Sequence, residues 1–154
     1  MTPSASGGPG NARPGNSAPS MPVSPAASPQ EQYDAAFALL RQVEYERAEK
    51  AFVSFIAQNK ESPLVGNAHY WLGETYYVRG KFPEAAGAFA EGFKKNPKGP
   101  KAADNLFKMG LSLAALNQKN DACVAFNQLN IQYPDAAANL KKRAEQERKR
   151  LNCS

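Results

Sequence analysis

Hydrophobic residues recur at every third or fourth position from Tyr33 onward, and no long stretch alternates with a period of two. This spacing is typical of amphipathic α-helices, whereas alternation would predict strands. Prolines, glycines and asparagines punctuate the pattern. Helix starts fit Ser62 followed by Pro63, Pro83 and Pro100, and helix ends fit Gly80 and Asn117. The pattern predicts an all-α fold with helices over residues 31–43, 46–59, 63–79, 83–95, 100–116, 119–132 and 136–151.

The predicted helices form three similar pairs. Shifting the chain against itself by roughly 37 residues superposes like residues, as expected of an internal repeat. The matching sets are Ala36, Gly73 and Gly110; Leu39, Tyr76 and Leu113; Ala48, Ala85 and Ala122; and Phe52, Phe89 and Phe126. A small residue on each first helix faces a small one on the second, so the two backbones can approach closely. The phenylalanine one turn later is expected to pack between helices.

These positions resemble the tetratricopeptide repeat. The middle unit matches best, with Leu72, Gly73, Tyr76, Gly80, Ala85, Phe89 and Pro97 at the family's positions. His69 stands where the family has an aromatic residue, and Trp71 follows two residues later. The resemblance implies a superhelix of three helix pairs within residues 31–154. Its units would be about 31–60, 63–97 and 100–134, followed by a capping helix over 136–151.

A narrower resemblance rests on the stretches AHYWLGETYYVRGKFPEAAGAF and DNLFKMGLSLAALNQKNDACVAFNQLNIQYP, with a proline closing each unit. Residues 32–152 resemble the C-terminal domain of the YbgF/CpoB family, the periplasmic Tol-Pal-associated cell division coordinators of Gram-negative bacteria. The resemblance implies a periplasmic location, a signal peptide in the precursor, and as partners the envelope protein TolA and a peptidoglycan synthase. It also implies a role in coordinating peptidoglycan synthesis with outer-membrane constriction. Trimerisation would depend on an upstream coiled coil that is absent here, so this chain is expected to be mainly monomeric.

Residues 1–30 contain seven of the 12 prolines and four of the 11 glycines, with few large apolar side chains. Such a segment cannot bury enough surface to offset the entropy lost on ordering. We interpret it as a disordered, extended linker, and we expect another domain upstream of it.

The first helices of a tetratricopeptide superhelix line its concave groove, where we expect the partner to bind. The residues expected to point inward are Tyr33, Phe37, Asn67, Tyr70, Glu74, Tyr77, Asp104, Phe107 and Leu111. An aromatic surface with scattered polar groups suits an extended or helical peptide.

Packing alone remains an alternative for Tyr70 and Tyr77, is favoured for Trp71 between units, and is expected for Tyr76, Phe89 and Phe126. A clamp for a C-terminal carboxylate needs Lys and Asn along this surface. Because Asn67, Tyr70, Trp71 and Glu74 stand there instead, a clamp of that kind is not expected.

The net charge of +5 is concentrated at one end. Residues 141–150 hold six Lys and Arg residues against two Glu residues. A nucleic-acid surface would spread its basic residues over a face of the fold, so this pattern favours a solvated capping helix. The alternative is a basic patch for an acidic partner or anionic lipid headgroups.

Catalysis is not expected. His69 is the only histidine, which excludes a multi-histidine metal centre, and Gly7, Gly8 and Gly10 lie in the linker rather than in a phosphate-binding loop. We therefore expect no enzyme activity and no cofactor in this chain, and its apolar runs are too short to span a membrane. A generic tetratricopeptide adaptor, such as an outer-membrane assembly factor or a secretion chaperone, is the alternative within the binding class. A peptidoglycan-modifying enzyme would need its catalytic domain before residue 1.

Cys123 and Cys153 are too far apart in sequence for a CxxC pair. If the last helix runs antiparallel to the helix holding Cys123, with the turn near Pro134, the two cysteines are offset by about 12 Å along the helix axes. That offset exceeds the roughly 7 Å Cα limit for a disulfide, so the spacing predicts free thiols or an intermolecular bridge.

Overall fold

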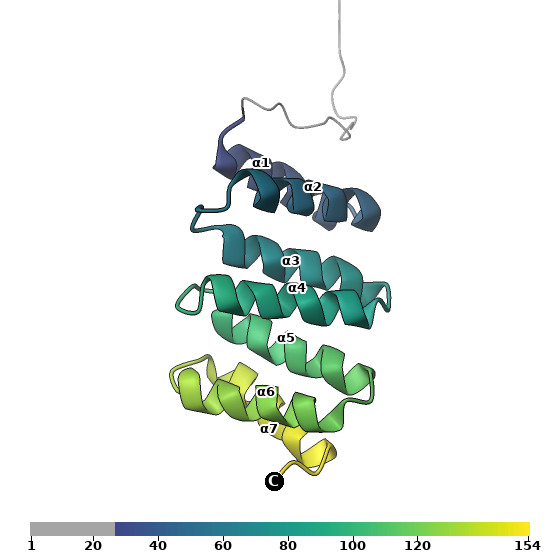
Figure 1. Cartoon of the computed structure of the whole chain (residues 1–154), viewed down its shortest axis with the longest axis vertical. Helices are drawn as coiled ribbons and strands as arrows, with labels where there is room; N and C mark the ends of the chain where they lie inside the picture. The colour runs from purple at the N-terminus through teal and green to yellow at the C-terminus, as the bar shows by residue number, and fades with distance from the viewer. Residues whose placement is uncertain (1–26) are drawn as a thin grey trace, which may run out of the picture.

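The computed structural model describes residues 27–154, and most of the predicted linker lies outside this range. The described part contains seven α-helices and no strand. They are α1 (Pro29–Arg41), α2 (Tyr45–Gln58), α3 (Val65–Val78), α4 (Phe82–Lys95), α5 (Ala102–Ala115), α6 (Lys119–Gln132) and α7 (Ala138–Arg150). Figure 1 shows them layered along the long axis of the molecule, from α1 and α2 at the top to α6 and α7 at the bottom. The predicted all-α superhelix of helix pairs is confirmed.

Helix α1 starts two residues earlier than predicted, at a capping box. The Glu31 backbone N–H donates to Ser28 Oγ at 3.1 Å, and the Ser28 N–H donates to the Glu31 carboxylate at 2.8 Å. These two bonds satisfy donors that a helix start would otherwise leave free, which fixes the boundary here.

Two predicted helix starts are wrong, and one is confirmed. Ser62 does not cap α3: its carbonyl accepts from the Val65 N–H at 3.1 Å, forming a turn that precedes the helix. Pro100 likewise lies in a turn before α5. Of the three prolines predicted to mark helix starts, only Pro83 occupies the first turn of its helix. Proline is favourable both in a turn and in the first turn of a helix, so its place in the sequence alone does not distinguish a turn from a helix start.

The contacts between helices are of two kinds. Each helix packs against the next in sequence, and α1, α3, α5 and α7 also contact one another in that order. In the described part of the chain, α2, α4 and α6 make no contacts of this second kind. The helices α1, α3, α5 and α7, called here the inner row, therefore form one continuous face, and α7 extends it at the C-terminal end.

All four inner-row helices end in the same way. Each is followed by a residue with a left-handed backbone, which is Val43 (φ 64°), Gly80 (φ 75°), Asn117 (φ 62°) or Asn152 (φ 57°). The next residue's N–H then donates to a carbonyl in the last turn of the helix, as Lys81 does to Tyr76 at 2.9 Å and Cys153 to Arg148 at 2.8 Å. This is the hydrogen bond of a Schellman motif, which reverses the chain. Helix α7 thus ends as a first helix of a pair does.

Glycines in α3 and α5 let an aromatic ring lie directly against the backbone. A Cβ added to Gly73 would lie 2.5 Å from the Phe89 ring, and one added to Gly110 would lie 2.6 Å from the Phe126 ring. Both rings are fully buried. The space left by each glycine is therefore filled by the phenylalanine of the second helix.

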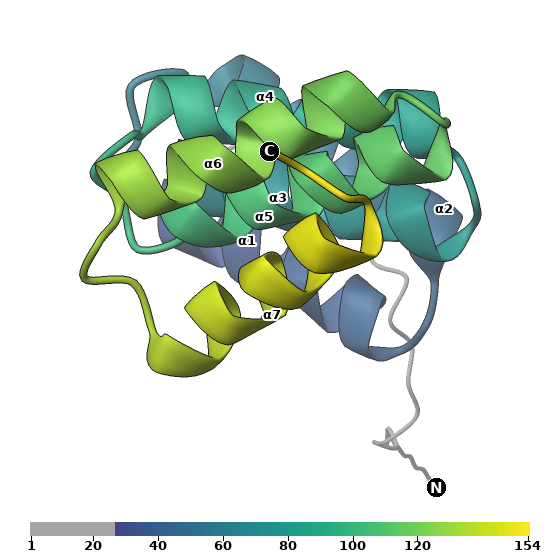
Figure 2. The same cartoon turned by 90° about the horizontal axis from the view of Figure 1, so that it is seen from below.

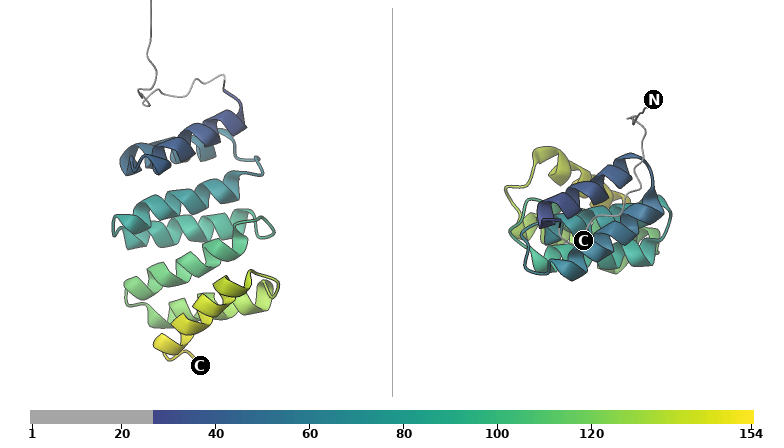
Figure 3. Two further views of the ribbon diagram at one scale, coloured as in Figure 1. Left: turned by 180° about the vertical axis from the view of Figure 1, so that it is seen from behind. Right: turned by 90° about the horizontal axis from the view of Figure 1, so that it is seen from above.

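The prediction of free thiols is wrong, because Cys123 and Cys153 form a disulfide with a Cα–Cα distance of 5.5 Å. The predicted offset assumed one straight helix running antiparallel from Pro134. Helix α7 instead begins at Ala138 and crosses α6 obliquely (Figure 2 and Figure 3). The left-handed Asn152 then turns the chain back, so Cys153 lies beside the last turn of α7 and meets Cys123 in α6.

We predict that Gly73→Ala lowers the free energy of unfolding by about 1 to 3 kcal/mol, because the new methyl group collides with the buried Phe89 ring. Gly87→Ala is the matched control, since a Cβ there meets nothing within 4 Å. It should stabilise helix α4 by about 0.5 to 1 kcal/mol through helix propensity alone. Urea unfolding followed by circular dichroism measures both. Equal effects of the two substitutions would contradict the packing described here.

The double variant Cys123→Ser/Cys153→Ser should unfold with a free energy about 2 to 4 kcal/mol lower, because the disulfide closes a loop with a sequence separation of 30 residues. Urea unfolding of the two proteins without reductant measures the difference. Adding reductant should lower the stability of the wild type but not that of the variant. Two thiols titratable in native, unreduced protein would show that the bond does not form.

Candidate functional site

The nine residues expected to line the groove all come from α1, α3 and α5, and aromatic contacts join the units. The Tyr33 and Phe37 rings stack in α1 with centroids 6.4 Å apart. Phe37 meets Trp71 of α3 edge-on at 5.0 Å, and Trp71 meets Tyr70 at 4.9 Å. Trp71 therefore packs between the first two units, as the sequence favoured.

Burial separates these residues into two groups. Phe107 is 1% exposed and lies beneath the Arg143 guanidinium, whose carbon is 4.7 Å from the ring centroid. The other eight are half-buried: Tyr33, Phe37, Asn67, Tyr70, Glu74, Tyr77, Asp104 and Leu111. Half-buried aromatic rings on a continuous face offer contact area to a partner, whereas Phe107 supports the face from below.

Cations lie over the aromatic rings of this face. Lys101 Nζ is 4.8 Å from the Tyr70 centroid and 5.0 Å from that of Trp71. Lys108 Nζ is 4.3 Å from the Tyr77 centroid, and the Arg41 guanidinium carbon is 5.5 Å from that of Phe37. Each distance is within the roughly 6 Å over which a cation is attracted to a ring face. The face therefore combines aromatic surface with positive charge.

Sequence reasoning missed Lys101, Lys108 and Arg143 as parts of this face. Lys108 could have been found, since it lies four residues after Asp104 and three before Leu111 on the same helical stripe. Lys101 precedes α5, and Arg143 belongs to α7. Their places depend on how helices pack, which residue spacing within one helix does not reveal.

Tyr70 and Tyr77 remain neutral phenols at physiological pH. Burial raises the pKa of Tyr70 well above its ordinary value, and the nearby Glu74 and Asp104 carboxylates raise it further. Burial and Glu74 raise the pKa of Tyr77 in the same way. Glu74 is itself held by Lys108, with Oε1 and Nζ 2.9 Å apart. The Tyr70 hydroxyl donates to Glu74 Oε2 at 3.5 Å, and the Tyr77 hydroxyl can donate a hydrogen bond to a carbonyl or carboxylate oxygen of a partner.

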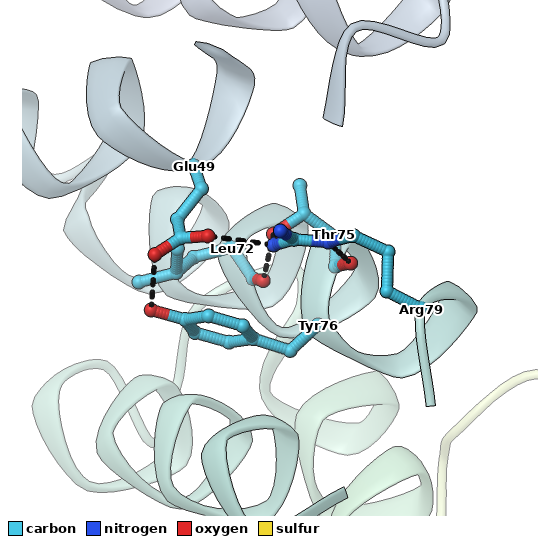
Figure 4. A network of polar contacts seen from close by, with 5 residues as sticks. All are labelled: Glu49, Leu72, Thr75, Tyr76 and Arg79. Carbon is cyan, nitrogen blue, oxygen red and sulfur yellow. Dashed lines mark hydrogen bonds and ion pairs between the residues drawn. The ribbon is translucent and has the colours of Figure 1, made fainter. Parts of the chain in front are cut away.

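A second polar cluster lies between α2 and α3 (Figure 4). Arg79 Nη2 donates to Glu49 Oε1 at 2.7 Å, and the Tyr76 hydroxyl donates to Glu49 Oε2 at 3.2 Å. Arg79 Nε also donates to the Thr75 carbonyl at 2.8 Å, while the Thr75 hydroxyl donates to the Leu72 carbonyl at 2.7 Å. These bonds occupy the charged groups, so the cluster joins the first unit to the second rather than forming a reactive site.

Residues with catalytic or metal-binding potential are dispersed or already engaged. Within residues 27–154, no three His, Cys, Asp or Glu residues are grouped so as to hold a metal ion. Burial lowers the pKa of His69, which is 9% exposed in α3, and Cys123 is engaged in the disulfide. The helices described here include none long and apolar enough to span a membrane.

Comparison with protein families gives two matches along the chain. Residues 33–103 and residues 104–136 match two family models, each described as Tetratricopeptide repeat. Together these matches cover all three helix pairs and most of the inner row.

Two Pseudomonas putida proteins, one from strain KT2440, are named Cell division coordinator CpoB and are 44% identical to this chain over 48 residues. That stretch is 31% of this chain and 18% of each relative. Similar solved structures include the Sgt2 TPR domain from Aspergillus fumigatus, with a TM-score of 0.64, 17% identity, and coverage of 85% of this chain and 82% of that one. The first TPR of Spaghetti (RPAP3) bound to the HSP90 peptide SRMEEVD has a TM-score of 0.60 and 14% identity over 77% of this chain and 91% of that one.

Glu49→Gln is expected to lower the free energy of unfolding by roughly 1 kcal/mol at pH 7, because it removes the charge that Arg79 binds. The hydrogen bond from Arg79 holds the pKa of Glu49 below its ordinary value of 4.5. The stabilisation is therefore present above about pH 4.5 and is lost as the pH falls through the lower folded-state pKa. Urea unfolding of both proteins between pH 7 and pH 3 tests this.

The control is Glu61→Gln, an exposed glutamate in the turn before α3 with no ion pair among the described residues. It should change the stability little at any pH. A wild-type advantage over Glu49→Gln that persists undiminished at the lowest pH would contradict the assignment.

Proposed function

Because this chain belongs to the tetratricopeptide-repeat family, we propose that its inner row binds a segment of a partner protein and that it acts as a non-catalytic interaction module of the Tol-Pal system. In this proposal it helps to coordinate peptidoglycan synthesis with outer-membrane constriction during cell division. Its partners are TolA and a peptidoglycan synthase. The mature protein is trimeric through an upstream coiled coil, and this part of it is monomeric.

The observation that carries the binding role is the set of half-buried aromatic side chains on one continuous face. Tyr70 and Tyr77 contribute aromatic rings, and Phe37 continues the aromatic surface into the first unit. Aromatic residues of this kind supply large contact areas at a low cost in side-chain entropy, which is why they dominate binding energies at protein interfaces. A peptide lying across α1 and α3 would contact all three of these rings.

Two observations support the cell-envelope setting. The first is the similarity to Cell division coordinator CpoB, which covers only 48 residues. The second is the disulfide between Cys123 and Cys153. Disulfides form and persist in oxidising compartments such as the bacterial periplasm and are rare in the cytosol. Both agree with a periplasmic protein.

Replacing Tyr70 and Tyr77 together by alanine should weaken the binding of TolA about tenfold or more, which corresponds to a loss of at least about 1.4 kcal/mol. Isothermal titration of the chain with purified TolA measures the affinity, and circular dichroism shows whether the variant remains folded. Because Tyr70 also packs on Phe89, with centroids 5.8 Å apart, a modest fall in melting temperature is expected.

Tyr45→Ala is the control, since this tyrosine begins α2 and lies off the inner row. It should bind TolA as the wild type does. Unchanged affinity of a folded Tyr70→Ala/Tyr77→Ala variant would overturn the binding face. No binding of TolA by the wild type would overturn this partner.

A further inference from the structure

We propose that the part of the inner row formed by α3, α5 and α7 selects a partner segment rich in Asp and Glu, whose carboxylates bind Lys101 and Arg143. The inference rests on the proposed function, because it names the chemistry of the segment that the inner row takes. The carboxylates meant are side chains within the segment rather than a chain terminus.

Lys101 and Arg143 are held in place by aromatic rings but retain their hydrogen-bond donors. Lys101 lies over both Tyr70 and Trp71, and Arg143 lies over Phe107. A ring face attracts a cation without accepting conventional hydrogen bonds from all of its N–H groups. A carboxylate approaching from outside can therefore bind the same cation, and the ring limits the entropy lost when it does.

Neither cation has a carboxylate partner within residues 27–154, unlike two other basic side chains of α5 and α7. Lys108 is paired with Glu74 at 2.9 Å, and Arg150 is paired with Glu147 at 2.6 Å. Lys101 and Arg143 take part in none of the ion pairs or side-chain hydrogen bonds of the described residues. Their positive charge is the part of this face that is left for a partner to neutralise.

The surrounding charge favours an anionic partner as well. Helix α7 carries most of the excess positive charge of the chain, and it lies in the inner row beside α5. Asp104 opposes this field, since its carboxylate is close enough to raise the pKa of Tyr70. It is one carboxylate against the two free cations Lys101 and Arg143. A complementary charge on the partner speeds association and suppresses wrong partners.

The probe is a displayed library of random peptides of about 12 residues, which in extended form span about 40 Å. Peptides selected on the wild-type chain are sequenced, and the affinities of the best are measured by fluorescence polarisation at low and high salt. Three variants are compared: Lys101→Gln/Arg143→Gln, Lys98→Gln/Lys142→Gln and Tyr70→Ala/Tyr77→Ala. The second has the same net charge as the first, but its exposed lysines take part in none of the ring contacts of the described residues.

The expected result is a selected pool enriched in Asp and Glu relative to the library. Its binding should weaken about tenfold in Lys101→Gln/Arg143→Gln and with rising salt, and change little in Lys98→Gln/Lys142→Gln. Selected peptides with no excess of acidic residues, or equal losses in the two glutamine variants, would overturn the preference for an acidic segment. The proposed function would still stand if the tyrosine variant lost those peptides.

Two further outcomes would replace the proposal. Acidic peptides that bind the Tyr70→Ala/Tyr77→Ala variant as tightly as the wild type would overturn the inner row as the binding face, and this proposal with it. Co-sedimentation with phosphatidylglycerol vesicles that depends on Lys101 and Arg143, without any selection of acidic peptides, would assign the cations to a lipid surface instead.

Discussion

The contact of a phenylalanine ring with a bare backbone determines how the helices of this protein pack. Gly73 and Gly110 have no side chain, so the fully buried Phe89 and Phe126 rings lie where a Cβ would otherwise be. The two helices of a pair are thereby drawn close together, which sets where the next pair can stack. This contact occurs in the second and third pairs, and in the stack α1, α3, α5 and α7 form one face while α2, α4 and α6 do not contact one another among the described residues.

The inner row is a consequence of that stacking, and it explains why the candidate site is made of residues distant in sequence. Trp71 of the second unit fits between Phe37 of the first and Lys101 before the third. Each unit thus completes the surroundings of its neighbour's aromatic side chains, and no single helix pair could present this face alone. Binding and stability are linked here, because the rings that a partner would meet also hold neighbouring units together.

The fold could be predicted from the sequence, because the helical periodicity and the repeat of three units independently indicate the same all-α architecture. The site could be predicted in part. Residues such as Tyr70 and Tyr77 follow from the stripe of a single helix, whereas Arg143 reaches Phe107 only through the crossing of α7. The cysteine prediction failed for a related reason, because a distance calculated for a straight helix ignores the chain reversal at Asn152. Asn152 has a left-handed backbone, a conformation that asparagine tolerates better than most residues.

Helix α7 determines where most of the excess positive charge of the sequence lies in the structure. As an isolated helix it would be a basic, solvated cap, since only Leu140 and Ala144 are buried. It ends, however, as the other inner-row helices end, and the Cys123–Cys153 disulfide fastens its end to α6. A surface helix with so little apolar contact would otherwise be free to fray or shift. The position of Arg143 depends on that of α7. The Cys123–Cys153 disulfide therefore also holds this positive charge in its place on the candidate binding face.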